Sequence, residues 1–213
     1  MIETDKARRA LRLLPPIVIG LAAAVLLFWS LDAKYLWQDE ANTAVLAVRM
    51  LRFGKPLAYD GVNFVGLDHF PMELLEPIEP RSHHPQDEVD YYIRHRYLKA
   101  DTTWKWHPWG QFVATALSIR LLGQTTLAAR LPFALASLIT VLLLYWLALE
   151  YCASIMIASV AAVLLTLNAY WILHARQCRY YSLSSLFLAL TFLCYAYWQR
   201  GGKWGQGAFI ASA

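Results

Sequence analysis

The stretch that decides the fold is LLPPIVIGLAAAVLLFWSL, residues 13–31, an apolar run of 19 residues without a charged side chain. A run of this length can cross the hydrocarbon core of a bilayer as a helix. Two adjacent acids, Asp39 and Glu40, follow within eight positions of its end. The sequence therefore predicts a first transmembrane helix that leads to a pair of carboxylates at a membrane surface, where a charge costs far less than inside the lipid.

The composition agrees with a membrane protein. Hydrophobic residues make up 58% of the 213 residues, charged residues make up only 16%, and the mean hydropathy is +0.37. We therefore expect an all-α fold, a polytopic membrane helix bundle with an outer loop that contains interfacial amphipathic helices. The net charge is +4, but the basic residues are scattered or lie at span ends, which argues against nucleic acid as a partner.

Four more apolar segments follow the first. Residues 131–149, 151–173 and 180–198 are free of charge and long enough to span, whereas residues 109–122 are shorter and contain Arg120. We divide the chain into a cytoplasmic N-terminus (1–12), the first transmembrane helix (13–31), an outer loop with the acid pair (32–106), membrane helices 2–5 (107–204) and the start of a sixth helix (205–213). Because this last piece is too short to cross a bilayer, we expect the sequence to be the N-terminal part of a longer protein.

The charge pattern suggests which side of the membrane each part occupies. Basic residues before the first span predict a cytoplasmic N-terminus and an outer location for the loop after it. If residues 109–122 cross the membrane, the 120–130 and 174–179 connections are inside and Arg200 and Lys203 are outside. If residues 109–122 do not cross, these assignments reverse. Charge bias alone does not choose between the two.

The segment after the acid pair is expected to lie in the interface. Residues 39–53 mix apolar positions with Arg49 and Arg52 and are followed by Gly54 and Pro56, which is typical of a short amphipathic helix. Residues 61–106 then form a polar outer loop, long enough to be functional. Its histidines lack metal-ligand spacing and the three cysteines form no CxxC pair, so we predict no metal site, and a divalent metal has no support.

Three groups of residues could carry chemistry, and each has a simpler structural interpretation. Asp39 and Glu40 could act as a general base or an electrostatic anchor, or could simply complement a helix dipole. Lys105 and His107 could grip a phosphate, or could be interfacial residues within an aromatic belt. The third group, HARQCRYY at 174–181, carries two arginines three positions apart that could present two guanidinium groups on one face, or could be a basic loop at a span end.

The order of several motifs resembles a known family. WQDEA (37–41), GKPLAYDG (54–61), HPWGQF (107–112), LLG (121–123), ARLPFALASLITVLLLYWLA (129–148) and HARQCRYYSLSSLFLAL (174–190) occur in this order. Together they are similar to the N-terminal part of membrane glycosyltransferases of the GT-C type, related to dolichyl-phosphate-mannose protein mannosyltransferases and bacterial aminoarabinose transferases. The resemblance covers nearly the whole chain. Members of that family are longer, with a second outer loop and further helices.

The resemblance implies an inverting hexosyl- or pentosyltransferase. Its donor would be a sugar on a polyprenyl-phosphate carrier in the membrane lipid, its acceptor a lipid, glycan or protein, and its location the outer face of a bacterial inner (plasma) membrane. It implies catalytic roles for Asp39 and the neighbouring Glu40. It also implies substrate-binding roles for Lys105, His107, Arg176, Arg179 and Tyr180. The family motif has two prolines where this chain has Pro108 and Trp109.

Two other functions remain open at this point. A transporter or flippase would use Asp39 and the arginines to line a substrate path, but transporters keep ionisable groups near the middle of the bilayer, whereas these lie at span ends. A non-catalytic membrane scaffold would use the long outer loop to bind a protein. In that case alanine substitutions in the loop would matter and a substitution of Asp39 would not.

Overall fold

The computed structural model describes residues 2–60, 63, 65, 102–201 and 207, with side chains from Arg12 onward. All regular elements in these residues are helices, which confirms the all-α prediction. They are α1 (Ile2–Phe28), α2 (Gln38–Phe53), α4 (Gly110–Leu122), α5 (Thr126–Cys152), α6 (Ile155–Leu167), α7 (Ala169–Ala175) and α8 (Tyr181–Gln199). A backbone bridge between Leu57 and Thr103 joins the two described ends of the outer loop.

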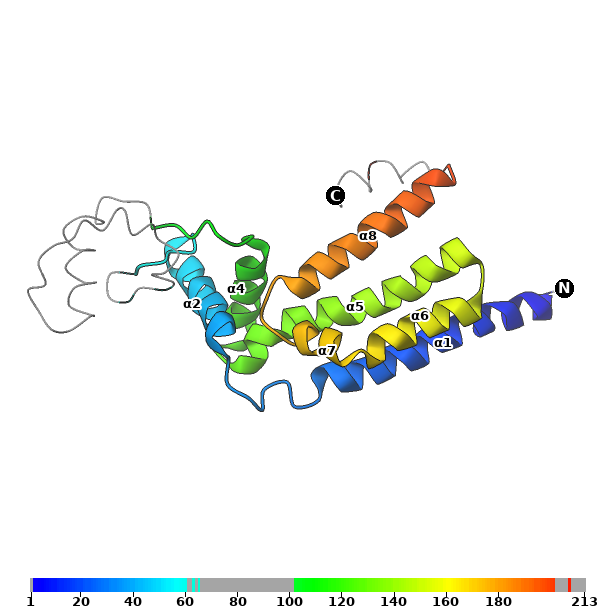
Figure 1. Cartoon of the computed structure of the whole chain (residues 1–213), viewed down its shortest axis with the longest axis horizontal. Helices are drawn as coiled ribbons and strands as arrows, with labels where there is room; N and C mark the ends of the chain where they lie inside the picture. Colours follow the sequence, from blue (N-terminus) through cyan, green and yellow to red (C-terminus); the bar gives the residue numbers. More distant parts are fainter. Residues whose placement is uncertain (1, 61–62, 64, 66–101, 202–206, 208–213) are drawn as a thin grey trace, which may run out of the picture.

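The helices form an elongated molecule with two kinds of packing. α5 packs against α1, α6 and α8, and these four helices run lengthwise in Figure 1, whereas α2 and α4 pack on each other at the end where α1 finishes and α5 starts. In the described part of the chain, α5 and α8 are each long and apolar enough to span a membrane. The bent pair α6–α7 would make a third span if it is counted as one, which is consistent with a membrane protein.

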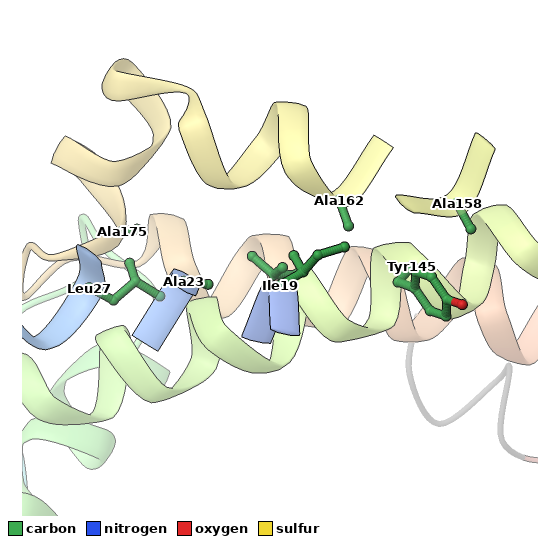
Figure 2. Packing of buried hydrophobic residues seen from close by; sticks show 8 residues of the cluster. Ile19, Ala23, Leu27, Tyr145, Ala158, Ala162 and Ala175 are labelled. Atoms are coloured by element: carbon green, nitrogen blue, oxygen red, sulfur yellow. The ribbon is translucent and has the colours of Figure 1, made fainter. Parts of the chain in front are cut away.

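Small residues allow α1, α5 and α6 to approach closely. Ala23 of α1 and Ala158 and Ala162 of α6 are almost fully buried in one apolar cluster (Figure 2). A Cβ atom at Gly20 would lie 3.1 Å from Cδ2 of Leu142 on α5. Between apolar helices, packing of this kind depends on small side chains that bring the backbones together.

A proline pair inside α1 explains a hydrogen bond between α1 and α5. Pro16 has no N–H, so the carbonyl of Arg12, four residues earlier, loses its usual helical donor. The hydroxyl of Tyr145, which is fully buried, donates to this carbonyl at 2.9 Å. Tyr145 therefore satisfies a polar group that the proline leaves without a partner.

We expect Tyr145→Phe to destabilise the fold by about 0.5–1.5 kcal/mol, because the Arg12 carbonyl then loses its hydrogen-bond donor. The measurement is thermal unfolding of the detergent-solubilised protein. Pro16→Ala restores the helical N–H, so the same Tyr145→Phe change should cost clearly less in that background. An equal loss in both backgrounds would contradict this role for Tyr145.

The observed helix bounds agree with two of the expected spans and correct two others. α5 and α8 cover the predicted 131–149 and 180–198 spans. The first helix ends at Phe28, so the last three residues of the predicted 13–31 span lie in a turn. Residues 151–173 do not form one helix. α5 ends at Cys152 and is followed by Ala153 in a left-handed conformation. Asn168 ends α6 and caps α7, because its side chain accepts a hydrogen bond from the Trp171 N–H, and the two helices meet at a bend of 68°.

The contacts also show at which end of the molecule each connection lies. Arg130 is hydrogen-bonded to Glu40, and Arg176 is hydrogen-bonded to the Trp29 carbonyl, so both lie at the end of the molecule where α1 finishes. Arg200 pairs with Glu150 near the other end of α5. This placement is the one expected if residues 109–122 do not cross the membrane, and the side of the membrane for each connection stays a prediction.

Most of the polar outer loop, including His69, His83, His84 and His95, lies outside the described residues. So does almost all of the expected start of a sixth helix at 205–213.

Candidate functional site

The site is built around the first turn of α2, where Asp39 and Glu40 point in different directions. Successive residues of a helix are rotated by about 100° from each other. Accordingly the Asp39 side chain is 41% exposed and lines a pocket, whereas the Glu40 side chain is 1% exposed and points into the protein. The two carboxylates predicted as one acidic pair therefore have different environments.

Glu40 connects three parts of the chain. Its Oε1 and Oε2 accept hydrogen bonds from Nε and Nη2 of Arg130 at 2.8 and 2.6 Å. Oε1 also accepts from the backbone N–H of Cys178 at 2.8 Å. Arg130 in turn donates to the carbonyls of Leu31 and Lys34, both at 2.9 Å. This buried network fixes the positions of α2, the start of α5 and the 176–180 connection relative to one another.

Next to this network lies a small polar pocket of about 150 Å³, hereafter the polar pocket. An acid, an imidazole and a guanidinium line it together with two amides and several packing residues. The lining residues are Asp39, Asn42, Thr43, Leu46, Trp104, His107, Gln111, Phe112 and Arg179. The site therefore combines a candidate base with candidate anion-binding groups.

Asp39 and Arg179 face each other across the polar pocket. Their Oδ2 and Nη2 atoms are 3.4 Å apart, and the Arg179 side chain is only 10% exposed. The Arg179 guanidinium also lies 5.6 Å from the centre of the Tyr180 ring. Because the Cys178 N–H is bound by Glu40, the next residue, Arg179, is held in place opposite Asp39.

His107 is fixed by Trp104. Trp104 is 2% exposed and packs with Leu46, Ala58 and Phe112. Its Nε1 donates to Nδ1 of His107 at 3.0 Å. Since an indole N–H only donates, Nδ1 of His107 carries no proton and the proton of the neutral ring is on Nε2. The Tyr180 ring lies beside the imidazole, with 6.0 Å between ring centres.

A larger, mainly apolar hollow of about 790 Å³ lies beside Glu40 and Arg130. It is lined by the 29–37 segment that follows α1, by Glu40 and Arg130, and by α7 with the two residues after it. Arg176 is on its wall and donates through Nη2 to the carbonyls of Trp29 and Ser30 at 2.6 and 3.1 Å. Burial and the nearby charge of Arg130 lower the pKa of Arg176. The hollow therefore combines apolar walls with a basic side chain.

The structure thus brings some of the predicted site residues together and separates others. Asp39, His107 and Arg179 line one pocket, with Tyr180 next to it. Arg176 lines the larger hollow and Lys105 is exposed on the surface. Glu40 is held by Arg130 and is not accessible to a substrate, so it is better placed to position other groups than to react.

Sequence reasoning missed Gln111 and Arg130. Gln111 interrupts the apolar run of α4, and Arg130 is a charge at the start of an apolar span. A polar residue inside an apolar helix was the available signal in both cases. Among the described residues, no group of three or more His, Cys, Asp or Glu is arranged to hold a metal ion.

The reactivity of Cys178 tests whether a reagent can reach the interior of the 176–180 connection, which forms a wall of the site. Its thiol lies 3.2 Å from Oγ1 of Thr115, and burial raises its pKa from 9.0 to about 12. A raised thiol pKa keeps the sulfur protonated at pH 8, and only the thiolate reacts. We expect maleimide to modify Cys178 at least about tenfold more slowly than the exposed Cys152 in the folded protein. Mass spectrometry of the peptides measures both rates, and similar rates would show that the wall is open.

Comparisons with protein-family models, with curated proteins and with solved structures give no match. The function is therefore argued from the geometry of the site.

Proposed function

We propose that the chain belongs to an inverting glycosyltransferase that moves a sugar from a polyprenyl-phosphate carrier to an acceptor at the outer face of the membrane. The observation that carries this proposal is the polar pocket, in which a carboxylate, an imidazole and a guanidinium meet at one end of apolar helices. The resemblance of the sequence motifs to the GT-C family supports the same reaction.

In the proposed reaction, Asp39 accepts the proton of the acceptor hydroxyl as its oxygen attacks the anomeric carbon of the sugar. The bond between that carbon and the phosphate oxygen breaks, and polyprenyl phosphate leaves with the bonding electron pair. A single displacement of this kind inverts the configuration at the anomeric carbon. Asp39 suits the role because it is partly exposed and lines the polar pocket.

Arg179 and His107 are suited to stabilise the leaving phosphate. Negative charge grows on the phosphate as it leaves, so cationic or N–H donors aimed at it stabilise the transition state more than the bound donor. Arg179 carries a permanent charge, and the bond from Trp104 fixes the imidazole with its proton on Nε2. A guanidinium is well suited to phosphate because it can form two parallel hydrogen bonds.

The larger hollow supports a lipid-linked donor. Its apolar walls suit a prenyl chain, and Arg176 offers a charge at the level of a phosphate. The hollow and the polar pocket share the 176–180 connection as a wall, since Arg176 and Gln177 line one and Arg179 lines the other. A carrier held in the hollow would therefore lie next to Arg179.

The placement of the charges favours an enzyme over a transporter. Asp39, Glu40, Arg130 and Arg179 gather at the end of the molecule where α1 finishes and α5 and α8 begin. A transport path would need such groups near the middle of the spans.

The test is transfer of a radiolabelled sugar. Membranes that contain the protein are incubated with polyprenyl-phosphate sugars, each labelled in the sugar, and the loss of label from the polyprenyl-phosphate carrier is followed after chromatographic separation of the lipids. The proposal expects loss of label with at least one donor and an inverted anomeric configuration in the product. Retention of configuration, or no loss from any hexosyl or pentosyl donor, would contradict it.

A further inference from the structure

Gln111 is a buried polar residue without a complete set of partners. It is the second residue of α4 and is 1% exposed. Its Oε1 is buried and has no hydrogen-bond partner among the residues that the structure describes. An acceptor buried in this way costs about 1–3 kcal/mol, so its presence calls for a reason other than stability.

The position of Gln111 points to a ligand. It lines the polar pocket together with Arg179, whose Nε is also buried and has no partner in the described residues. Two residues that line the same small pocket therefore each carry a buried polar atom, one acceptor and one donor, that the described protein does not satisfy.

These two atoms indicate the chemistry of the missing group. An ionised phosphate only accepts hydrogen bonds, so it can satisfy Nε of Arg179 but not Oε1 of Gln111. A hydroxyl group both donates and accepts. The unsatisfied acceptor therefore calls for a ligand group that donates a hydrogen bond, which phosphate cannot do and a sugar hydroxyl can.

We propose that Gln111 determines specificity for the sugar by accepting a hydrogen bond from one of its hydroxyl groups in the polar pocket. This inference rests on the proposed function and goes further by assigning two parts of the sugar donor, the phosphate and the sugar, to two different residues. Arg179 binds the phosphate, whereas Gln111 distinguishes a sugar-bearing carrier from the bare carrier phosphate.

The experiment uses Gln111→Met, which has a similar size and no acceptor, and Gln111→Leu as a second variant. With the sugar donor that the wild type transfers, kcat/KM should fall about 10–100-fold in both variants, because a hydroxyl of the bound sugar then has no acceptor. One monodeoxy form of that donor should lose the same factor with the wild type and nothing further with the variants. Ser118→Ala is the matched control. Ser118 is also buried in α4 and its Oγ has no partner among the residues that the structure describes, but it does not line the polar pocket.

The outcomes separate this inference from the proposed function. Transfer by the wild type with unchanged kcat/KM and unchanged deoxy preference in both variants overturns the role of Gln111 and leaves the reaction standing. If the wild type transfers no sugar, the inference is tested by the thermal stabilisation of the protein that each carrier produces on binding. Greater stabilisation by the sugar-bearing carrier than by polyprenyl phosphate, lost in Gln111→Met, supports the inference, whereas an equal response of wild type and variant overturns it.

Discussion

Asp39→Asn is expected to lower kcat by about 10²–10⁴-fold, the usual contribution of a positioned general base. The amide keeps the size of the side chain but cannot take the proton of the acceptor. Binding of the donor should not weaken, because the change removes a negative charge 3.4 Å from Arg179 and leaves that guanidinium available to phosphate. The measurement is steady-state transfer of labelled sugar, which separates kcat from KM.

Asp32→Asn is the matched control for this prediction. Asp32 is an exposed acid in the connection between α1 and α2, shortly before Asp39, and it does not line the polar pocket. The control should retain wild-type kcat and KM. If Asp39→Asn also retained near-normal kcat, Asp39 would have no part in the chemistry.

Glu40→Gln should have the largest effect on stability, a loss of about 3–5 kcal/mol. The change removes the negative partner of Arg130, whose side chain is 11% exposed, and leaves that guanidinium charge without compensation. It also weakens the bond to the Cys178 N–H that holds Arg179 opposite Asp39. Thermal unfolding in detergent measures the loss, and transfer activity should fall with it.

Glu150→Gln provides the comparison. Glu150 pairs with Arg200 near the other end of α5, but their side chains are 34% and 59% exposed. Exposed pairs contribute about 0–1 kcal/mol, so this variant should unfold close to the wild type. Equal and small losses in both variants would show that the Glu40 network does not hold the site together.

Much of the helical architecture is predictable from the sequence, because it depends on local patterns. Charge-free apolar runs predict α5 and α8, and the mixed segment after Asp39 followed by Gly54 predicts α2, which ends at a left-handed Gly54. The break between α6 and α7 is harder to predict, since it depends on the side chain of one residue, Asn168, capping the second helix within an apolar stretch.

The candidate site is only partly predictable, because it depends on contacts between distant segments. Residue types and motif order indicate Asp39, His107 and Arg179. Helix geometry separates the directions of Asp39 and Glu40, but nothing local reveals that Glu40 meets Arg130, 90 positions later, or that Trp104 fixes the His107 ring. The location of the 120–130 connection at the end of the molecule where α1 finishes likewise follows from the Glu40–Arg130 contact and not from a local pattern.

The central claim is that the sugar donor binds in the polar pocket, and protection of an introduced thiol tests it most directly. Asn42 lines this pocket, so Asn42→Cys can be modified by a small maleimide, with the exposed Cys152 as an internal reference. The account predicts that a polyprenyl-phosphate sugar slows modification at position 42 and leaves Cys152 unchanged. Equal rates at position 42 with and without a saturating donor would contradict it.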